Sequence, residues 1–127
     1  MAAGIRVLIA DDDEVICDLV SFKLSQAGYA VQVVRDGATA LQAITTERPG
    51  LAILDVMMPG LSGFDVLRKL RQDPATADQA VILLTAKSRD TDIDTGFVTG
   101  AQDYIVKPFS PRELLHRVNG VLARSRR

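Results

Sequence analysis

The sequence predicts a single α/β domain, a (βα)5 unit whose doubly wound parallel sheet is covered by helices on both faces. Three observations indicate this fold. Short apolar runs alternate along the chain with segments whose apolar residues recur at helical spacing. Gly and Pro residues mark the ends of most of these segments, and no repeat, low-complexity tract or linker occurs before residue 124. Strands that alternate with helices are joined by right-handed crossovers, which produce a parallel sheet.

The first two elements are a strand at Ile5–Ala10 and a helix that begins at Glu14. The strand is apolar apart from Arg6 and stops at three acids, a pattern typical of a strand covered on both faces. Asp13 precedes the helix, where a carboxylate caps the chain and interacts favourably with the helix dipole. Gly28 favours a left-handed stop at the other end. The apolar stripe of this helix consists of Ile16, Leu19, Val20, Leu24 and Ala27.

A second strand and helix follow, and then a third strand that ends in a single acid. Tyr29–Val34 predicts the second strand, and Asp36-Gly37 indicates a turn. The second helix ends before Pro49. Its buried stripe is predicted to be Ala38, Leu41 and Ile44. The apolar run Leu51–Leu54 then stops abruptly at Asp55, so this strand brings one carboxylate to its carboxyl end.

A third helix and a fourth strand begin the second half of the chain. The helix has Phe64, Leu67 and Leu70 on one face and is closed by Asp73-Pro74. The fourth strand is expected over Ala80–Thr85. We interpret Ser88–Val98 as a helix with a thin apolar stripe, which Gly100 ends.

The last two elements are a short strand at Tyr104–Val106, ended by Lys107-Pro108, and a helix with a well-marked start. Ser110 is expected as the N-cap, Pro111 as the first helical residue, and Glu113 as the second member of a capping box. The core face of this helix is predicted to be Leu114, Leu115, Val118, Val121 and Leu122.

We assume the flavodoxin-like strand order 2-1-3-4-5, because it gathers the polar residues at the strand ends along one edge of the sheet. A crevice opens at that edge where the direction of winding reverses. The residues are Asp11, Asp12, Asp55, Thr85 and Lys107. The domain is expected to take in residues 1–127, with a core over about 4–123 and a basic tail or the start of a linker at 124–127.

Composition excludes several classes of protein. With 15 basic and 16 acidic residues, the net charge of -1 gives no general attraction to nucleic acid or anionic membranes. Cys17 is the single cysteine and cannot form an internal disulfide, and the amino terminus lacks the apolar segment of a signal peptide. Apolar runs such as Ala80–Leu84 fall far short of the roughly 20 residues that span a bilayer. We therefore expect a cytoplasmic protein.

Three neighbouring carboxylates indicate a metal site. Each pair would repel by about 1 to 4 kcal/mol at about 4 Å, and Lys107 supplies only one positive charge. A divalent ion would bring the formal charge to zero, and oxygen ligands favour Mg²⁺ or Mn²⁺. Zinc is not expected, since Cys17 and His116 lie on predicted helices. A carboxylate beside such an ion can accept a phosphoryl group, with Asp55 as nucleophile and with Lys107 and Thr85 on the phosphoryl oxygens.

Four motifs in order resemble the receiver domain of two-component response regulators. They are Asp11-Asp12, Asp55-x-x-Met58-Pro59-x-x-x-Gly63, Thr85-Ala86, and Gly100-Ala101-x-Asp103-Tyr104-x-x-Lys107-Pro108-Phe109. The resemblance covers nearly the whole chain. It implies a signalling phosphoacceptor rather than an enzyme, in which Asp55 takes a phosphoryl group from a histidine of a sensor kinase or phosphotransfer protein.

The resemblance also implies roles for individual residues. Asp12, Asp55 and the backbone carbonyl of Met57 would ligate Mg²⁺, and Asp11 would act mostly through water. The Lys107–Pro108 peptide would be cis. Thr85 and Tyr104 would change position when the domain is phosphorylated. The face made by the fourth helix, fifth strand and fifth helix would then change and control an output domain or a partner. Met57 and Lys87 would set the phosphoryl lifetime, and their long side chains favour slow self-dephosphorylation.

Other readings remain open from the sequence. Some receivers dimerise through charged pairs on the fifth strand and fifth helix, and Asp103, Glu113, Arg117 and Arg124 partly fit that pattern.

A haloacid-dehalogenase-like phosphohydrolase would use Asp11 as nucleophile and Asp13 as acid. That family also needs an acidic pair at a later strand end, which Thr85-Ala86 does not provide. A receiver-like docking module that is never phosphorylated is the third possibility.

Overall fold

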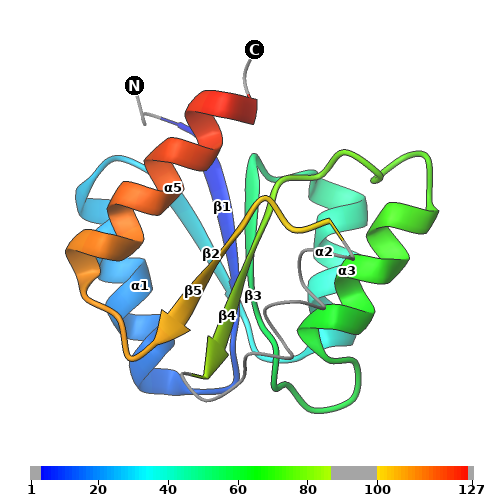
Figure 1. Ribbon diagram of the computed structural model, residues 1–127, viewed down its shortest axis with the longest axis horizontal. Helices are drawn as coiled ribbons and strands as arrows, with labels where there is room; N and C mark the ends of the chain where they lie inside the picture. Colours follow the sequence, from blue (N-terminus) through cyan, green and yellow to red (C-terminus); the bar gives the residue numbers. More distant parts are fainter. Residues whose placement is uncertain (1–3, 87–99, 126–127) are drawn as a thin grey trace.

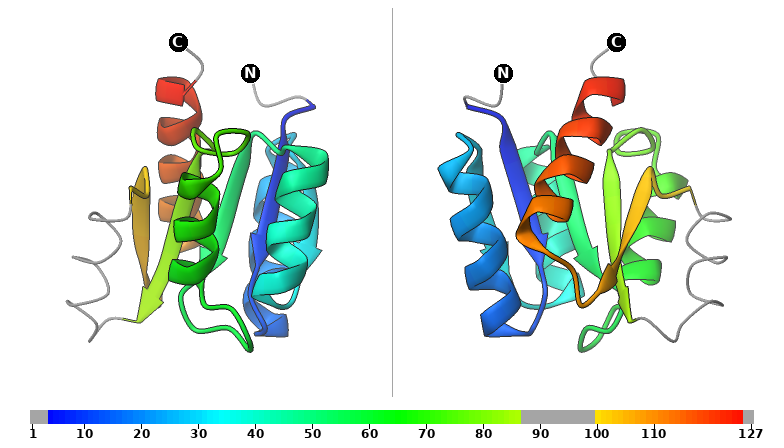
Figure 2. Two further views of the ribbon diagram at one scale, coloured as in Figure 1. Left: turned by 90° about the vertical axis from the view of Figure 1, so that its right-hand side faces the viewer. Right: turned by 60° about the vertical axis from the view of Figure 1, so that its left-hand side comes forward.

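A parallel sheet of five strands forms the middle layer of the molecule, in the order β2-β1-β3-β4-β5. The computed structural model describes residues 4–86 and 100–125. The strands are β1 (Arg6–Ala10), β2 (Ala30–Val34), β3 (Leu51–Asp55), β4 (Val81–Ala86) and β5 (Asp103–Lys107). All neighbouring pairs are parallel, so the carboxyl ends of the strands share one edge (Figure 2). The assumed strand order is therefore confirmed.

Helices cover both faces of the sheet, with α1 and α5 on one face and α2 and α3 on the other (Figure 1). Their bounds are α1 (Glu14–Gln26), α2 (Gly37–Glu47), α3 (Gly63–Gln72) and α5 (Pro111–Ser125). The segment Ser88–Val98, expected to form a helix, lies outside the described residues, as does Lys87. Among the described helices, none combines the length and apolar character that a membrane span requires.

Alternate residues of the inner strands pack into two separate cores. In β1, Val7 and Ile9 face the α1 and α5 layer, whereas Leu8 and Ala10 face α2 and α3. All four side chains are at most 1% exposed. Because side chains on a strand alternate between its faces, a strand that is apolar throughout can be buried on both. The expectation that the first strand is covered on both faces is therefore confirmed.

The structure corrects the prediction at the start of α2. Gly37 is the first helical residue rather than part of a turn, and Asp36 is the N-cap, which accepts a hydrogen bond from the Thr39 N–H. Ala38, predicted to be buried, is exposed. The buried residues are Gly37, Ala40, Ala43 and Ile44, with Leu41 partly buried. The predicted positions Ala38 and Leu41 each lie one residue after the buried Gly37 and Ala40, because the helix starts earlier than the assumed turn allowed.

At the start of α5 the predicted N-cap is confirmed, whereas the end of this helix differs from expectation. The Ser110 hydroxyl accepts a hydrogen bond from the Glu113 N–H at 3.0 Å, as expected of an N-cap. A complete capping box, however, occurs at α3, where Ser62 and Asp65 each accept from the backbone N–H of the other. At the carboxyl end, α5 continues through Ser125, beyond the expected end of the core.

Candidate functional site

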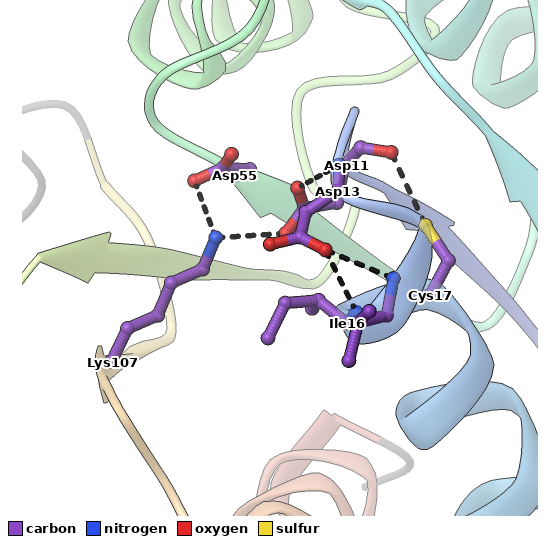
Figure 3. A network of polar contacts seen from close by, with 7 residues as sticks. Asp11, Asp13, Ile16, Cys17, Asp55 and Lys107 are labelled. Carbon is purple, nitrogen blue, oxygen red and sulfur yellow. Dashed lines mark hydrogen bonds and ion pairs between the residues drawn. The ribbon is translucent and has the colours of Figure 1, made fainter.

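Lys107 lies between two carboxylates at the carboxyl edge of the sheet. Its Nζ atom donates to Asp11 Oδ2 at 2.9 Å and lies 3.3 Å from Asp55 Oδ1 (Figure 3). The three residues come from the ends of β5, β1 and β3, so the shared edge of the sheet brings them together. The Lys107–Pro108 peptide is cis, as expected.

Asp11 is completely buried, and both of its carboxylate oxygens are engaged. Oδ1 accepts from the Asp13 N–H at 2.9 Å, and Oδ2 accepts from Lys107. The Cys17 thiol donates to the Asp11 carbonyl oxygen at 3.2 Å (Figure 3). Burial, followed by the charge of Asp11, raises the pKa of Cys17 to about 11. The thiol is therefore a packing residue that also orients the Asp11 backbone.

Asp13 caps α1 rather than entering the carboxylate cluster. Its side chain accepts from the N–H groups of Val15 and Ile16 at 2.9 and 3.3 Å. The helix start thereby fixes the turn that follows β1 and the two acids in it. The capping role expected for Asp13 is confirmed.

The side chains of Asp11, Asp12 and Asp55 can place one oxygen each within 4.8 Å of one another. Asp11 and Asp55 are buried, whereas Asp12 is exposed to solvent. Such a cluster can bind a metal ion, and its donors are all oxygen atoms, which favour a hard divalent cation over zinc.

The electrostatics of this cluster favour an additional cation. Burial, and then the negative charge of Asp11, raises the pKa of Asp55 to about 6, although Lys107 opposes the shift. Burial alone would lower the pKa of Lys107, but the hydrogen bond to Asp11 and the charge of Asp55 raise it overall. One lysine therefore does not offset the negative charge that the strands gather here.

Thr85 contributes a buried hydroxyl next to Asp55. It follows Leu84, which pairs with Asp55 across β3 and β4, and only 2% of its surface is exposed. Among the described residues, its Oγ1 atom has no hydrogen-bond partner. Buried hydroxyls without a partner are rare, and one at the edge of a charged cluster is a donor that an incoming anionic group can use.

The remaining predicted residues are Met57, Tyr104 and Lys87. Met57 follows β3 and its side chain is 58% exposed, while Met58 is buried. Tyr104 lies on β5, is half-buried, and packs against the core formed with α2 and α3. Lys87, the second timing residue, lies outside the described residues.

Three of the four residues proposed for a dimer face, Asp103, Glu113 and Arg117, pair with one another within the chain. Arg117 Nη1 lies 3.1 Å from both Asp103 oxygens, and its Nε donates to Glu113 at 3.2 Å. Arg124 lines the same shallow surface hollow, which also includes Asp103, Glu113 and His116. Sequence spacing located this charged group but could not predict that its members neutralise each other internally.

The family model of the response regulator receiver domain matches residues 7–119. The chain belongs to the response regulator receiver family. Membership makes it a signalling domain rather than a classic enzyme. The phosphohydrolase alternative is therefore not retained, and the capping role of Asp13 also leaves it poorly placed as an acid.

Relatives of this receiver domain include transcriptional regulators. It is 45% identical over 122 residues to a DNA-binding dual master transcriptional regulator, RpaA, of Synechocystis sp., covering 96% of this chain and 51% of the relative. It is 41% identical to the DNA-binding response regulator MtrA of Mycobacterium tuberculosis, covering 94% and 51%. The receiver thus spans about half the length of these relatives.

Solved structures agree with the fold. A putative response regulator from Chloroflexus aurantiacus superposes with a TM-score of 0.90 at 38% identity, covering 94% of this receiver and 98% of that chain. A likeness of this extent shows the same arrangement of strands and helices in an experimentally determined relative.

Proposed function

We propose that this receiver domain is the phosphoacceptor of a two-component system and that Asp55 takes the phosphoryl group. The observation that carries the proposal is the position of Lys107 Nζ, 3.3 Å from Asp55 and 2.9 Å from Asp11. A carboxylate that gains a phosphoryl group gains negative charge, and a cation already in contact with it stabilises that charge where it develops.

In the reaction, an Asp55 carboxylate oxygen attacks the phosphorus of a phosphohistidine on a sensor kinase or phosphotransfer protein. The new O–P bond forms as the P–N bond breaks, and the imidazole leaves with the electron pair of that bond and takes up a proton. Lys107 neutralises one phosphoryl oxygen, and the Thr85 hydroxyl, buried without a partner among the described residues, donates to another. The long side chain of Met57, which is exposed beside the end of β3, would slow the loss of the group to water.

The residues present fit a magnesium or manganese ion, which would neutralise the charge that the phosphoryl oxygens bring. Asp12, Asp55 and the Met57 carbonyl would hold it. Asp11 would act through water, since both of its oxygens already accept hydrogen bonds from Asp13 and Lys107.

Phosphorylation would act on the surface formed by β5 and α5, and on the helix predicted at Ser88–Val98, which lies outside the described residues. Thr85 and Tyr104 lie on adjacent strands, so a shift of the Thr85 hydroxyl toward the phosphoryl group changes the environment of Tyr104. The altered face would control an output domain or a partner in the cytoplasm. DNA binding is described for the relatives above and, by this proposal, does not belong to the domain itself.

Intact-mass measurement after incubation with acetyl phosphate and Mg²⁺ tests the proposal. We expect the wild type to gain one phosphoryl group and Asp55→Asn to gain none. Asp65→Asn, which changes an aspartate at the start of α3, is the matched control and should label like the wild type. Labelling of Asp55→Asn, or an unlabelled wild type, would contradict the proposal and leave a docking module as the better description.

Homodimer formation is a further part of this proposal. A dimer through Asp103, Glu113, Arg117 and Arg124 would have to exchange the internal pairs of Arg117 for pairs across the interface. Each exposed pair contributes only about 0 to 1 kcal/mol, so this exchange is nearly neutral. Light scattering with beryllofluoride and Mg²⁺ should show a doubled mass at micromolar concentrations, and an unchanged mass would exclude this dimer.

A further inference from the structure

The loop between β3 and α3 carries Met57 and is closed at its base by a direct contact. The Gly63 N–H donates to the Val56 carbonyl at 3.1 Å. A Cβ atom added to Gly63 would lie 2.5 Å from the Asp55 carbonyl oxygen. The start of α3 therefore touches the backbone of the phosphoacceptor, and the two ends of the loop are fixed against each other.

The far side of the same loop rests on the start of α2. A Cβ atom added to Gly37 would lie 2.1 Å from the Leu61 carbonyl oxygen and 2.7 Å from Leu61 Cβ. Real Cβ atoms essentially never approach other atoms within 3.0 Å, and the first of these neighbours is backbone. Gly37 is helical, so the position requires glycine because of space rather than because of an unusual backbone angle.

Neither partner in this contact can retreat freely. Asp36 caps α2 by accepting from the Thr39 N–H at 2.7 Å and from the Thr39 hydroxyl at 2.9 Å, which fixes the first turn. Leu61 is partly buried and packs against the core between the sheet, α2 and α3. The Ser62 cap of α3 follows immediately. A side chain at Gly37 would therefore push the loop and the start of α2 apart.

We propose that Gly37 is a positioning residue for the metal-binding loop. Its missing side chain lets α2 support Leu61, and this support together with Gly63 holds the Met57 carbonyl beside Asp55. The inference rests on the proposed function, because it requires that the Met57 carbonyl ligates Mg²⁺. Gly37 itself touches neither the metal nor the phosphoryl group.

The test is a Mg²⁺ titration of Gly37→Ala followed by NMR of the backbone amides. We expect the dissociation constant to rise by about tenfold, the lower end of what loss of groups supporting a metal site typically costs. Amide resonances of residues 56–58 and 60–62 should also shift in the absence of metal. Gly120→Ala is the matched control, since the nearest atom to its added Cβ is Nη1, at the far end of the Arg124 side chain, at 3.5 Å. Its affinity for Mg²⁺ should be that of the wild type.

Two further variants separate positioning from general loss of stability. Leu122→Ala removes a buried side chain on α5, on the opposite face of the sheet, and should leave Mg²⁺ binding unchanged although it destabilises the fold. Leu61→Ala keeps Gly37 but removes the packing of the loop, and should weaken binding even if Gly37→Ala does not fold.

The possible results distinguish failure of this inference from failure of the proposed function. Wild-type affinity in folded Gly37→Ala or in Leu61→Ala would overturn the inference alone, as would equal weakening in Leu122→Ala. Failure of the wild type to bind Mg²⁺ would overturn the inference together with the metal-dependent part of the proposed function.

Discussion

The two edges of the parallel sheet use polar side chains in opposite ways. At the amino edge, long polar side chains hydrogen-bond to the backbone. Arg71 donates to the Gly100 carbonyl through Nε and Nη2, at 3.2 and 2.7 Å. The Gln79 amide donates to the carbonyls of Pro49 and Ala80 at 3.0 and 3.1 Å, which ties together the beginnings of β3 and β4.

At the carboxyl edge, charged side chains face one another instead. Asp11 and Asp55 share one lysine, and the Thr85 hydroxyl has no partner among the described residues. At the amino edge, side chains provide hydrogen bonds to backbone carbonyls and stabilise the fold. At the carboxyl edge, the excess negative charge and the Thr85 hydroxyl, unpaired among the described residues, would gain partners only when a cation and a phosphoryl group bind. Sites of this kind cost stability that other parts of a protein must supply.

Among the substitutions that test this difference between the two edges, Arg71→Ala at the amino edge should have the largest effect on stability. The substitution removes the bonds to Gly100 and one to Gln102 Oε1, although it also removes the buried Nη1 atom, which has no partner among the described residues. We expect the free energy of unfolding to fall by about 2 kcal/mol in urea titrations.

Phosphorylation of Arg71→Ala by acetyl phosphate should be retained under conditions where the variant is folded. Arg68→Ala on the same helix is the control, because its exposed pair with Asp65 contributes at most about 1 kcal/mol. If Arg71→Ala were as stable as Arg68→Ala, or lost phosphorylation while folded, the division between the two edges would not hold.

A smaller effect, of opposite sign, is expected at the carboxyl edge in Asp55→Asn. Because the folded protein raises the pKa of Asp55 from 3.8 to about 6, it binds this proton more tightly than the unfolded chain does. Stability is therefore lost as pH rises from about 4 to about 6, and the full penalty remains above that range. Without divalent metal at pH 7, Asp55→Asn should be more stable than the wild type by about 1 to 2 kcal/mol, allowing for solvent screening.

The gain in Asp55→Asn should vanish below about pH 4, which urea titrations at several pH values in chelator would check. Asp65→Asn should behave in the opposite way. The backbone N–H of Ser62, and then Arg68, lower the pKa of Asp65, so its contribution to stability is present at neutral pH and lost on acidification. A destabilised Asp55→Asn at pH 7 would show that Lys107 offsets more charge than the geometry indicates.

The smallest expected effect compares two buried threonines. The Thr76 hydroxyl donates to the Leu70 carbonyl at 2.8 Å, whereas the Thr85 hydroxyl has no such partner. Thr76→Val should cost about 1 kcal/mol in the free energy of unfolding, and Thr85→Val should be close to neutral. Thermal denaturation measures both, and a Thr85→Val variant as unstable as Thr76→Val would mean that the hydroxyl is satisfied in solution.

The fold and the members of the site were predictable because their signals are local. Each apolar strand ends in or is followed by a polar residue, and a parallel sheet places all such ends along one edge, so the sequence alone predicts that Asp11, Asp55 and Lys107 lie together. The sequence predicted the ends of helices and strands less accurately. Asp36-Gly37 reads equally as a turn and as a helix start, and the wrong choice placed Ala38 in the core.

Contacts between distant segments could not be predicted from spacing. Arg71 and Gly100 meet only because α3 ends beside the beginning of β5, and Gly37 meets Leu61 because α2 and α3 pack side by side. Cys17 could have been assigned to packing, since it lies at helical spacing from Val20 and Leu24 on the buried face of α1. Its bond to the Asp11 carbonyl depends on the turn after β1 and has no signature in the sequence.

The position of β5 at the margin of the sheet has a mechanical consequence. Asp11 follows β1 and Asp55 ends β3, strands with a neighbour on each side, whereas β5, which bears Lys107, is hydrogen-bonded only to β4 among the strands that the structure describes. When the charge between them changes, the lysine and its strand can yield at lower cost than either aspartate. Beyond the shift of the Thr85 hydroxyl itself, movement that follows phosphorylation should therefore be largest at this outer strand and at α5.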